Sequence, residues 1–382
     1  MRIVIASNPF KGSMSGIEVA DRIAAGMRDG FGGRMSADKV PIADGGDGTL
    51  DAVAASVRAR EVRMKAPDAL GRSRATRYLL IDGGATAVVE MALVSGLAMI
   101  EASERNPEAA STRGMGALIA DALERGARRV IVGIGGSATN DGGVGMAAAL
   151  GYRFIGADGR EVEPRGGTLK DIKKIDATGA NERLRGAEIL VACDVTNPLV
   201  GPRGASAVYG PQKGADAAMV KRLDAGLKSY AGVVERHFKR EFRNEPGAGA
   251  AGGAGFGLMA FAGARLVSGI DLMIDITGLD ARASVADMMV TGEGRMDSQS
   301  AQGKAPFGAL KLAKKYGIPA IAFCGGVEEE ESLNAAGFTA VFPIVDKPMS
   351  LEAAMRDGGE LLERAARRAG RLLRAGVRMG AK

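Results

Sequence analysis

The sequence predicts an α/β protein built on a doubly wound parallel sheet, with a second α/β domain inserted in it. Three observations indicate this class. Short apolar runs typical of strands alternate with helical patterns, and glycine-rich or turn-forming stretches follow the strands. A segment in the first half of the chain changes to closely spaced runs typical of antiparallel hairpins. With 382 residues, the chain is long enough for about two or three domains.

The elements of the doubly wound sheet can be placed in order. The first strand is expected at residues 3–6, and a helix follows from about Ser15, where Ser15 and Glu18 make a capping box. Later strands are expected at residues 130–133, 189–193, 288–291, 320–323 and 340–344, with helical patterns at 114–124 and 306–316 between them. Because this alternation is typical of parallel sheets, helices should cover both faces.

The inserted domain is predicted from a change of spacing. Between residues 61 and 90, turns at Leu70-Gly71 and Asp82-Gly83-Gly84 separate short strand-like runs, and residues 152–175 show a similar pattern. We therefore expect one discontinuous doubly wound α/β domain at residues 1–60 and 285–382, and an inserted α/β domain at residues 61–284.

The composition excludes several chemistries. His237 is the only histidine, so Ser-His-Asp hydrolysis and paired-histidine zinc sites are excluded. Cys193 and Cys324 are too few and too far apart for a disulfide framework, which favours a reducing compartment. The N-terminus lacks the pattern of a signal peptide, and the uncharged stretch 247–264 contains seven glycines, which predicts a loop and a short buried helix. We expect a cytoplasmic protein that does not interact with membranes.

The positive charge is concentrated at the C-terminus. The net charge is +6, but residues 364–382 contain six arginines, one lysine and no acid, so the rest of the chain carries −1. Apolar residues recur at helical spacing from Leu361 to Leu373, and the tail has no aromatic residue. A surface helix with a solvated basic side is therefore favoured, and no nucleic-acid partner is expected.

Five glycine-containing clusters carry hydroxyl, carboxylate or ammonium groups, and four of them follow predicted strands. They are residues 7–13 (SNPFKGS), 43–49 (ADGGDGT), 133–143 (GIGGSATNDGG), 193–199 (CDVTNPL) with 209–214 (YGPQKG), and 291–304, read as one loop containing Glu293, Arg295, Asp297 and Lys304. Ligands of open α/β sheets bind at the carboxyl ends of strands. Each cluster could also be an ordinary turn, since Gly, Asp and Asn favour turns.

Together these clusters supply what phosphoryl transfer requires. Backbone N–H groups and cations can surround phosphates, and carboxylates can hold Mg²⁺ or accept a hydroxyl proton. Two common kinase signatures are absent. The Walker A loop needs Ser or Thr after Gly-Lys, but neither follows Gly303-Lys304, and the protein-kinase catalytic loop needs Arg-Asp after its histidine, but Phe238 follows His237. The third cluster also contains G-x-G-x-x-A, a weak form of the dinucleotide fingerprint.

As a set, six ordered motifs resemble the type I bacterial glycerate kinases. They are FKGS at residues 10–13, ADGGDGT at 43–49, GGSATNDGG at 135–143, CDVTNPL at 193–199, GPQKGA at 210–215 and TGEGRMDSQS at 291–300. The resemblance covers residues 10 to about 326. Two positions depart from the family pattern, because Asn8 stands where Asp is frequent and Asp47 where Glu is usual.

The resemblance implies phosphorylation of D-glycerate by ATP with Mg²⁺, usually at the 2-hydroxyl, to give 2-phosphoglycerate. It also implies a flavodoxin-like domain, an inserted domain and an active site in the cleft between them. On this basis the expected catalytic residues are Lys11, Asp44, Asp194 and Arg295, with Asp44 and Asp194 serving as base and Mg²⁺ ligand in an order left open. The expected substrate- and phosphate-binding residues are Ser13, Asp47, Gly135, Gly136, Ser137, Thr139, Asn140, Lys213, Glu293 and Lys304.

Other functions are kept as alternatives. The same kinase could make 3-phosphoglycerate, since nothing in the loops separates the two hydroxyls. A nicotinamide-dependent oxidoreductase is suggested only by the G-x-G-x-x-A match. A non-catalytic basic binding protein is suggested only by the sequence pI of about 9.3.

Overall fold

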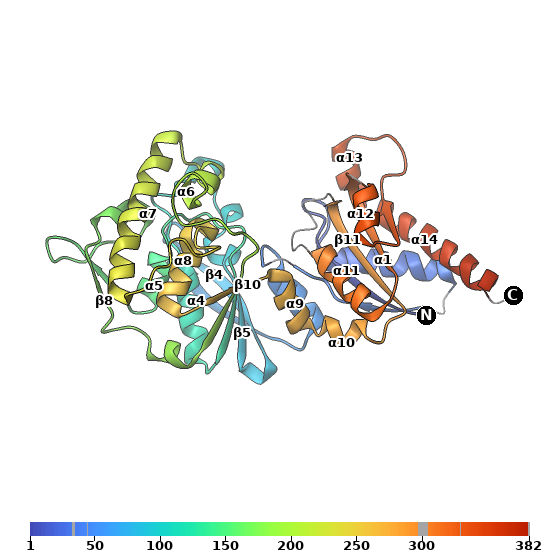
Figure 1. Cartoon of the computed structure of the whole chain (residues 1–382), viewed down its shortest axis with the longest axis horizontal. Helices are drawn as coiled ribbons and strands as arrows, with labels where there is room; N and C mark the ends of the chain where they lie inside the picture. Colours follow the sequence, from blue (N-terminus) through green and yellow to red (C-terminus); the bar gives the residue numbers. More distant parts are fainter. Residues whose placement is uncertain (33–34, 44, 297–304, 329, 381–382) are drawn as a thin grey trace. The chain divides into compact units, whose positions relative to one another are not determined.

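The computed structural model describes residues 1–32, 35–43, 45–296, 305–328 and 330–380, and the statements below concern these residues. The chain divides into two compact units, coloured along the sequence in Figure 1. Unit 1 comprises Met1–Asp44, Asp51–Val57 and Gly269–Lys382, and unit 2 comprises Gly45–Leu50 and Arg58–Ser268. The second boundary lies at Gly269, sixteen residues before the predicted position 285. The helices Gly269–Thr277 and Leu279–Ala283 pack on elements of unit 1, and the Arg282 guanidinium donates to Asp38 and to the Ser56 carbonyl, both in unit 1.

Unit 1 contains a five-stranded parallel sheet in the order β2-β1-β11-β12-β13. This is the flavodoxin-like order, in which the first strand lies next to an edge strand and the direction of winding reverses between β1 and β11. The strands are β1 (Arg2–Ser7), β2 (Ser36–Lys39), β11 (Met288–Met296), β12 (Ala320–Val327) and β13 (Ala340–Pro343). The helices are α1 (Gly16–Phe31), α2 (Thr49–Ser56), α9 (Gly269–Thr277), α10 (Leu279–Ala283), α11 (Ala305–Tyr316), α12 (Glu330–Ala336), α13 (Leu351–Arg356) and α14 (Gly358–Gly380).

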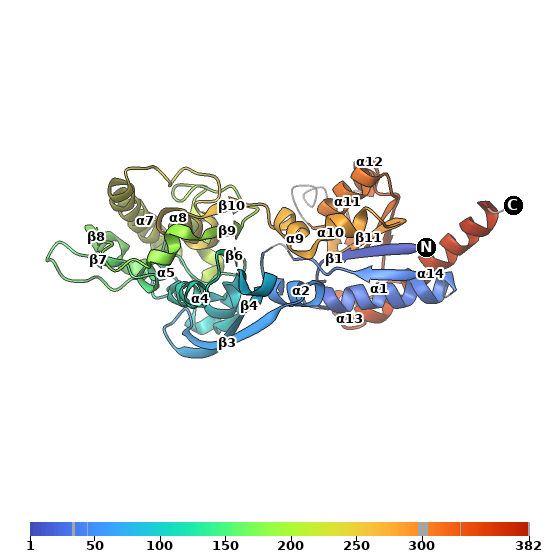
Figure 2. The ribbon, with the colours of Figure 1, turned by 90° about the horizontal axis from the view of Figure 1, so that it is seen from below.

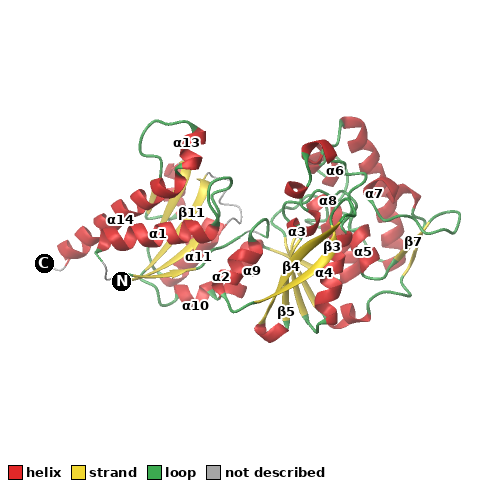
Figure 3. Cartoon of the chain, turned by 180° about the vertical axis from the view of Figure 1, so that it is seen from behind, coloured by secondary structure: helices red, strands yellow, loops and turns green. Residues whose placement is uncertain are grey.

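Helices cover both faces of this sheet, as Figure 3 shows. On one face, alternate strand residues such as Ile5 and Phe323 form a core with α1 and α14. On the other face, α10 and α11 pack on β1 and the neighbouring strands. Ser15 caps α1 by accepting a hydrogen bond from the Glu18 N–H, as the capping box predicts.

The pairing of α1 with α14 depends on glycines. The two helices lie side by side in Figure 2. A Cβ at Gly30 would lie 2.1 Å from the Arg367 carbonyl oxygen, and one at Gly26 would lie 2.3 Å from that of Glu363. Only glycine allows the two backbones to approach so closely.

Unit 2 contains a six-stranded mixed sheet in the order β10-β9-β6-β5-β4-β3. Strands β3 (Arg60–Pro67), β4 (Ser73–Ile81) and β5 (Thr86–Glu90) form the predicted antiparallel hairpins. Strands β5, β6 (Arg129–Gly133), β9 (Glu188–Ala192) and β10 (Arg265–Val267) are parallel, so their carboxyl ends lie at one edge. A separate antiparallel pair joins β7 (Arg153–Ile155) to β8 (Lys174–Asp176), within the region where short strands are expected.

The core of unit 2 lies between one face of this sheet and a group of helices. The α-helices are α3 (Ala92–Ser95), α4 (Arg113–Glu124), α5 (Val144–Ala149), α6 (Ala205–Tyr209), α7 (Ala217–Phe238) and α8 (Ala250–Ala262). The 3₁₀ helices are η1 (Asp82–Gly84), η2 (Leu97–Met99), η3 (Ala102–Glu104), η4 (Gly166–Asp171), η5 (Glu182–Gly186) and η6 (Pro211–Lys213). The long helix α7 was not among the predicted elements. In the part of the chain that the structure describes, no helix combines the length and apolar character that crossing a bilayer requires.

Candidate functional site

The loop that joins β6 to α5 in unit 2 has two consecutive backbone N–H groups that find no acceptor among the described residues, one at the exposed Gly136 and one at the buried Ser137. Gly136 adopts a positive φ of +70°. Consecutive N–H groups of this kind form a concave site for anions. Residues 133–143 are called the phosphate loop below, because they are the ones predicted to contact phosphates.

Lys213 supports this loop from inside the unit. Its side chain is only 2% exposed, and its Nζ donates to the Ser137 Oγ at 2.8 Å and to the Thr139 carbonyl oxygen at 2.7 Å. Burial lowers the pKa of Lys213 to about 7, although the nearby Asp141 carboxylate opposes this shift. The sequence prediction gave Lys213 a substrate contact. The structure instead shows its ammonium group hydrogen-bonded within the loop.

Asp141 fixes the far end of the phosphate loop. The buried carboxylate accepts hydrogen bonds from the N–H and hydroxyl of Thr112 at 2.8 and 2.9 Å, and from the N–H groups of Gly143 and Gly145. Burial raises the pKa of Asp141, and these hydrogen bonds oppose the rise. Because all four donors stabilise the loop and the start of α5, we assign Asp141 a structural role.

The middle of the phosphate loop contains polar atoms without partners. Asn140 donates from Nδ2 to the Ser206 Oγ at 3.0 Å. The Asn140 Oδ1 and the Thr139 Oγ1 are buried and have no hydrogen-bond partner among the described residues. Buried polar atoms are normally satisfied, so each of these two atoms can still accept a hydrogen bond.

A second loop packs against the phosphate loop. A Cβ at Gly45 would lie 2.4 Å from the Ala192 Cβ, and one at Gly136 would lie 2.7 Å from the Asp47 Oδ1. Residues 45–50 therefore lie beside the ends of β6 and β9, and Asp47 is exposed there. Asp194 is exposed two residues after the end of β9, on the same edge of the sheet.

Glu90 is a residue that sequence analysis missed. It is the last residue of β5, it is buried, and its two carboxylate oxygens accept the N–H groups of Gly48 at 3.1 Å and Leu50 at 3.0 Å. Glu90 thereby holds the loop that carries Asp47. The sequence contained a signal, because a carboxylate at the end of an apolar strand needs buried donors.

Three predicted residues, Lys11, Ser13 and Glu293, lie at the winding reversal of unit 1, beside β1 and β11. The Asn8 N–H donates to the Gly292 carbonyl, which joins the ends of these strands. Lys11 is exposed, and a Cβ at Gly294 would lie 3.6 Å from its backbone nitrogen. The Ser13 hydroxyl donates to the Met355 carbonyl oxygen at 2.6 Å, which anchors the loop. Glu293 is half-buried.

The segment read as a loop from residue 291 is partly wrong. Residues 291–296 extend β11 and pair with β12, where Arg295 lies opposite Gly326. The glycines of this segment suggested a loop, but pairing with β12 supplies the backbone hydrogen bonds of a strand, and glycine does not prevent that pairing. The Arg295 guanidinium is exposed and lies 2.8 Å from both carboxylate oxygens of Glu328. Asp44, Asp297 and Lys304 lie outside the described residues.

The predicted residues therefore form two sets, one within each unit. In unit 2, the set comprises Asp47, Gly135, Gly136, Ser137, Thr139, Asn140, Asp194 and Lys213; in unit 1, it comprises Lys11, Ser13, Glu293 and Arg295. No cluster of three potential metal-binding side chains occurs among the described residues.

Comparisons with known proteins find similarity to glycerate kinases along nearly the whole chain. The family model for the glycerate kinase family matches residues 3–374. A glycerate kinase of Bacillus subtilis (strain 168) is 42% identical over 368 residues, which cover 96% of each chain. A glycerate 2-kinase of Escherichia coli (strain K12) is 42% identical over 379 residues, which cover 99% of each chain.

The fold comparison gives the same result. The crystal structure of a candidate glycerate kinase 2 from Salmonella typhimurium LT2 matches with a TM-score of 0.88 and 41% identity, over 99% of both chains. This agreement confirms the two α/β domains and the family resemblance predicted from the motifs. The chain therefore belongs to the glycerate kinase family, and it is a kinase.

Proposed function

We propose that this enzyme transfers the γ-phosphoryl group of ATP to the 2-hydroxyl of D-glycerate, giving ADP and 2-phospho-D-glycerate. The bond from phosphorus to the ADP oxygen breaks, a bond from phosphorus to the substrate oxygen forms, and a carboxylate accepts the hydroxyl proton. The single observation that carries the proposal is the phosphate loop, whose N–H groups at Gly136 and Ser137 have no acceptor among the described residues. The E. coli relative is named a glycerate 2-kinase, which favours the 2-hydroxyl.

We assign the phosphates of ATP to Gly135, Gly136 and Ser137. In this assignment Lys213 is a positioning residue, because its buried Nζ holds Ser137 and Thr139 and thereby orients the N–H groups. Lys11 and Arg295 would neutralise the glycerate carboxylate or the transferring phosphoryl group, with assistance from Lys304. Ser13 and Glu293 would position this second set of cations.

The carboxylates present fit a Mg²⁺ site. Mg²⁺ in kinases is usually held by one or two carboxylates together with phosphate oxygens and water, so a three-acid cluster is not required. Asp194 and Asp47 are exposed on neighbouring loops beside the phosphate loop, and Asp44 directly precedes the second loop. When bound, Mg²⁺ would offset negative charge on the phosphates. Asp44 and Asp194 are our candidates for the base and the metal ligand, in either order.

The other functions have less support. Oxidoreductase activity is not favoured, because relatives that match over nearly the whole chain are named glycerate kinase or glycerate 2-kinase. A nucleic-acid partner is not favoured either, since Arg364 and Arg368 on α14 form ion pairs with Asp346, and Arg367 with Asp29. Formation of 3-phosphoglycerate stays open as an alternative product of the same site. The cytoplasmic location stays part of the proposal, because two cysteines are too few for a disulfide framework.

One assay tests the activity and the product. Purified enzyme with Mg²⁺-ATP should release ADP only when D-glycerate is added, and NMR of the product should show phosphorus coupled to the proton on carbon 2. Release of ADP that does not depend on glycerate would contradict the proposal. Coupling to the protons on carbon 3 would replace the product with 3-phosphoglycerate.

A further inference from the structure

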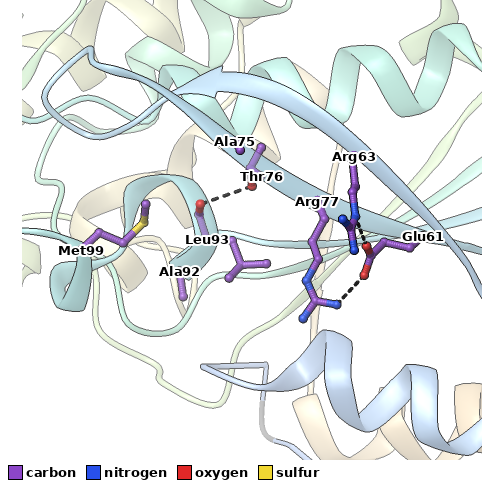
Figure 4. Close-up of a pocket in the computed structure, with 8 residues that line it drawn as sticks. All are labelled: Glu61, Arg63, Ala75, Thr76, Arg77, Ala92, Leu93 and Met99. Atoms are coloured by element: carbon purple, nitrogen blue, oxygen red, sulfur yellow. Dashed lines mark hydrogen bonds and ion pairs between the residues drawn. The ribbon is translucent and has the colours of Figure 1, made fainter.

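A pocket of about 470 Å³ lies in unit 2, beside the β3–β4 hairpin. Figure 4 shows the side chains around it, none of which belongs to the predicted site. Its apolar lining comes from the strand residue Ala75 and from Ala92, Leu93 and Met99, which follow β5. The pocket also contains the guanidinium groups of two arginines, which are described next.

Arg63 and Arg77 are directly opposite each other on β3 and β4, so their side chains lie on the same face of the hairpin. Glu61 binds both of them, since its carboxylate accepts from the Arg63 Nε at 2.6 Å and from the Arg77 Nη1 at 2.7 Å. These hydrogen bonds lower the pKa of Glu61. Glu61 thus holds the two planar guanidinium groups at one side of an apolar pocket. Planar guanidinium groups stack well on aromatic rings.

The pocket adjoins the phosphate loop. The Ala92 Cβ lies 3.5 Å from the position that a Cβ of Gly136 would occupy. Beyond Ala92, the Leu97 N–H donates to the Gly136 carbonyl oxygen at 2.7 Å, and the Ala138 N–H donates to the Ser95 carbonyl oxygen at 2.8 Å. The segment that forms one wall of the pocket is therefore hydrogen-bonded to the loop assigned to the phosphates.

We propose that this pocket binds the purine nucleoside of the phosphoryl donor, while the phosphates of the same molecule lie on the phosphate loop. The inference rests on the proposed kinase activity. A mostly apolar pocket of this volume is within the range for nucleotide-sized ligands and is much larger than a three-carbon acid needs. The two arginines could bind the carboxylate of D-glycerate, but a three-carbon acid would leave the apolar lining at Ala92, Leu93 and Met99 uncovered, whereas a purine ring would cover it.

The first test fills the pocket. Ala75 is exposed on a strand, so Ala75→Ile adds rigid volume with a residue that strands favour. We expect the KM for ATP to rise at least about fivefold, with the KM for D-glycerate within about twofold of wild type. Ala85→Ile is the matched control, because Ala85 is also exposed but precedes β5, at the opposite end of that strand. A rise in the KM for D-glycerate alone would overturn the inference and assign the pocket to the acceptor.

The second test needs no turnover, so it separates this inference from the proposed activity. The chain has no tryptophan, and Met99→Trp therefore places a single indole in the pocket wall, with Ala85→Trp as control. ATP should change the fluorescence of Met99→Trp to saturation, whereas inorganic tripolyphosphate and D-glycerate should not. Equal responses to ATP and tripolyphosphate, or no response to ATP, would overturn the nucleoside site whether or not the enzyme phosphorylates glycerate.

Discussion

The Nζ of Lys213 lies 2.8 Å from the Oγ of Ser137, although 76 positions separate the two residues in the sequence. The same Nζ donates to the Thr139 carbonyl oxygen. Lys213→Met keeps a long side chain but removes both hydrogen bonds, so the phosphate loop should lose its orientation. We expect the KM for ATP to rise about tenfold or more, with a smaller change in the KM for D-glycerate.

Steady-state kinetics of Lys213→Met beside Lys221→Met would measure this effect. Lys221 is exposed on α7, so its variant controls for the loss of a lysine from the same unit. Equal increases in both KM values would indicate general damage to the fold. A wild-type KM for ATP in Lys213→Met would exclude a positioning role.

Lys213 should also make stability depend on pH. Its pKa is lowered to about 7 in the folded chain by burial, whereas an unfolded lysine titrates near 10.4. Between these two values the unfolded chain binds more protons than the folded chain, so the free energy of unfolding rises with pH. Below about pH 7 both states are protonated, and the cost of burying the charge is fully present.

We therefore expect wild-type enzyme to gain stability relative to Lys213→Met as the pH rises from 7 to about 10. Urea unfolding of both proteins at several pH values would measure this, and titration of all other groups cancels in the difference. A difference that does not change with pH would show that the ammonium group is not buried.

The two carboxylates assigned to the chemistry should be needed for turnover. We expect Asp194→Asn and Asp44→Asn each to lower kcat about tenfold or more, because an amide cannot accept the hydroxyl proton and binds Mg²⁺ weakly. Both variants should keep the thermal unfolding temperature of the wild type. Asp158→Asn is a suitable control, since Asp158 is an exposed acid in the 153–176 region. Near-normal kcat for both site variants would remove the assignment.

Glu90 should act through the loop that it holds. Glu90→Gln replaces one carboxylate oxygen with an NH₂ group, so one of the Gly48 and Leu50 N–H groups loses its acceptor. We expect a loss of kcat of about tenfold, as the residues around Asp47 shift. Kinetics, with circular dichroism to confirm the fold, would measure this. Unchanged kcat would show that the position of this loop does not limit the reaction.

The close packing of α1 on α14 should be sensitive to a single methyl group. A Cβ at Gly30 would lie 2.1 Å from the Arg367 carbonyl oxygen, so the two backbones must separate in Gly30→Ala. Overpacking of this kind costs about 1–3 kcal/mol, which exceeds the gain from the better helix propensity of alanine. Denaturant unfolding of unit 1 would measure the change.

Gly376→Ala provides the matched comparison within α14. No atom lies within 4 Å of a Cβ at Gly376, so this variant should be neutral or more stable by up to about 1 kcal/mol. A neutral result for Gly30→Ala as well would mean that the helices are less tightly packed than the structure shows.

Much of the fold could be predicted from local patterns. The strands expected at residues 3–6, 130–133 and 189–193 agree with β1, β6 and β9 within one or two residues, because apolar runs between turn residues are strong signals. Helix α7 was missed although the sequence held a signal, because its buried residues Leu223, Leu227, Tyr230 and Val234 recur at helical spacing. Strands β2 and β10 were missed because they have only four and three residues.

The candidate site could be predicted only in part. The sequence singled out residues 133–143, Lys213 and Asp194 by residue type and order, and their roles in binding and catalysis stay predictions. It did not identify Glu90 or the structural role of Asp141, because both depend on backbone donors that come from distant segments. It also predicted a loop at residues 291–296, where pairing with β12 continues a strand.

The sequence by itself determined the class of this protein. Its single histidine excluded several mechanisms, and six ordered motifs were enough to place it in the glycerate kinase family. Only the tertiary structure decided which charged side chains are buried and which groups they contact. The charge of a lysine is the same at every position of a sequence, but burial is a property of the fold. Lys11 is therefore exposed to solvent, whereas Lys213 is buried and holds the phosphate loop.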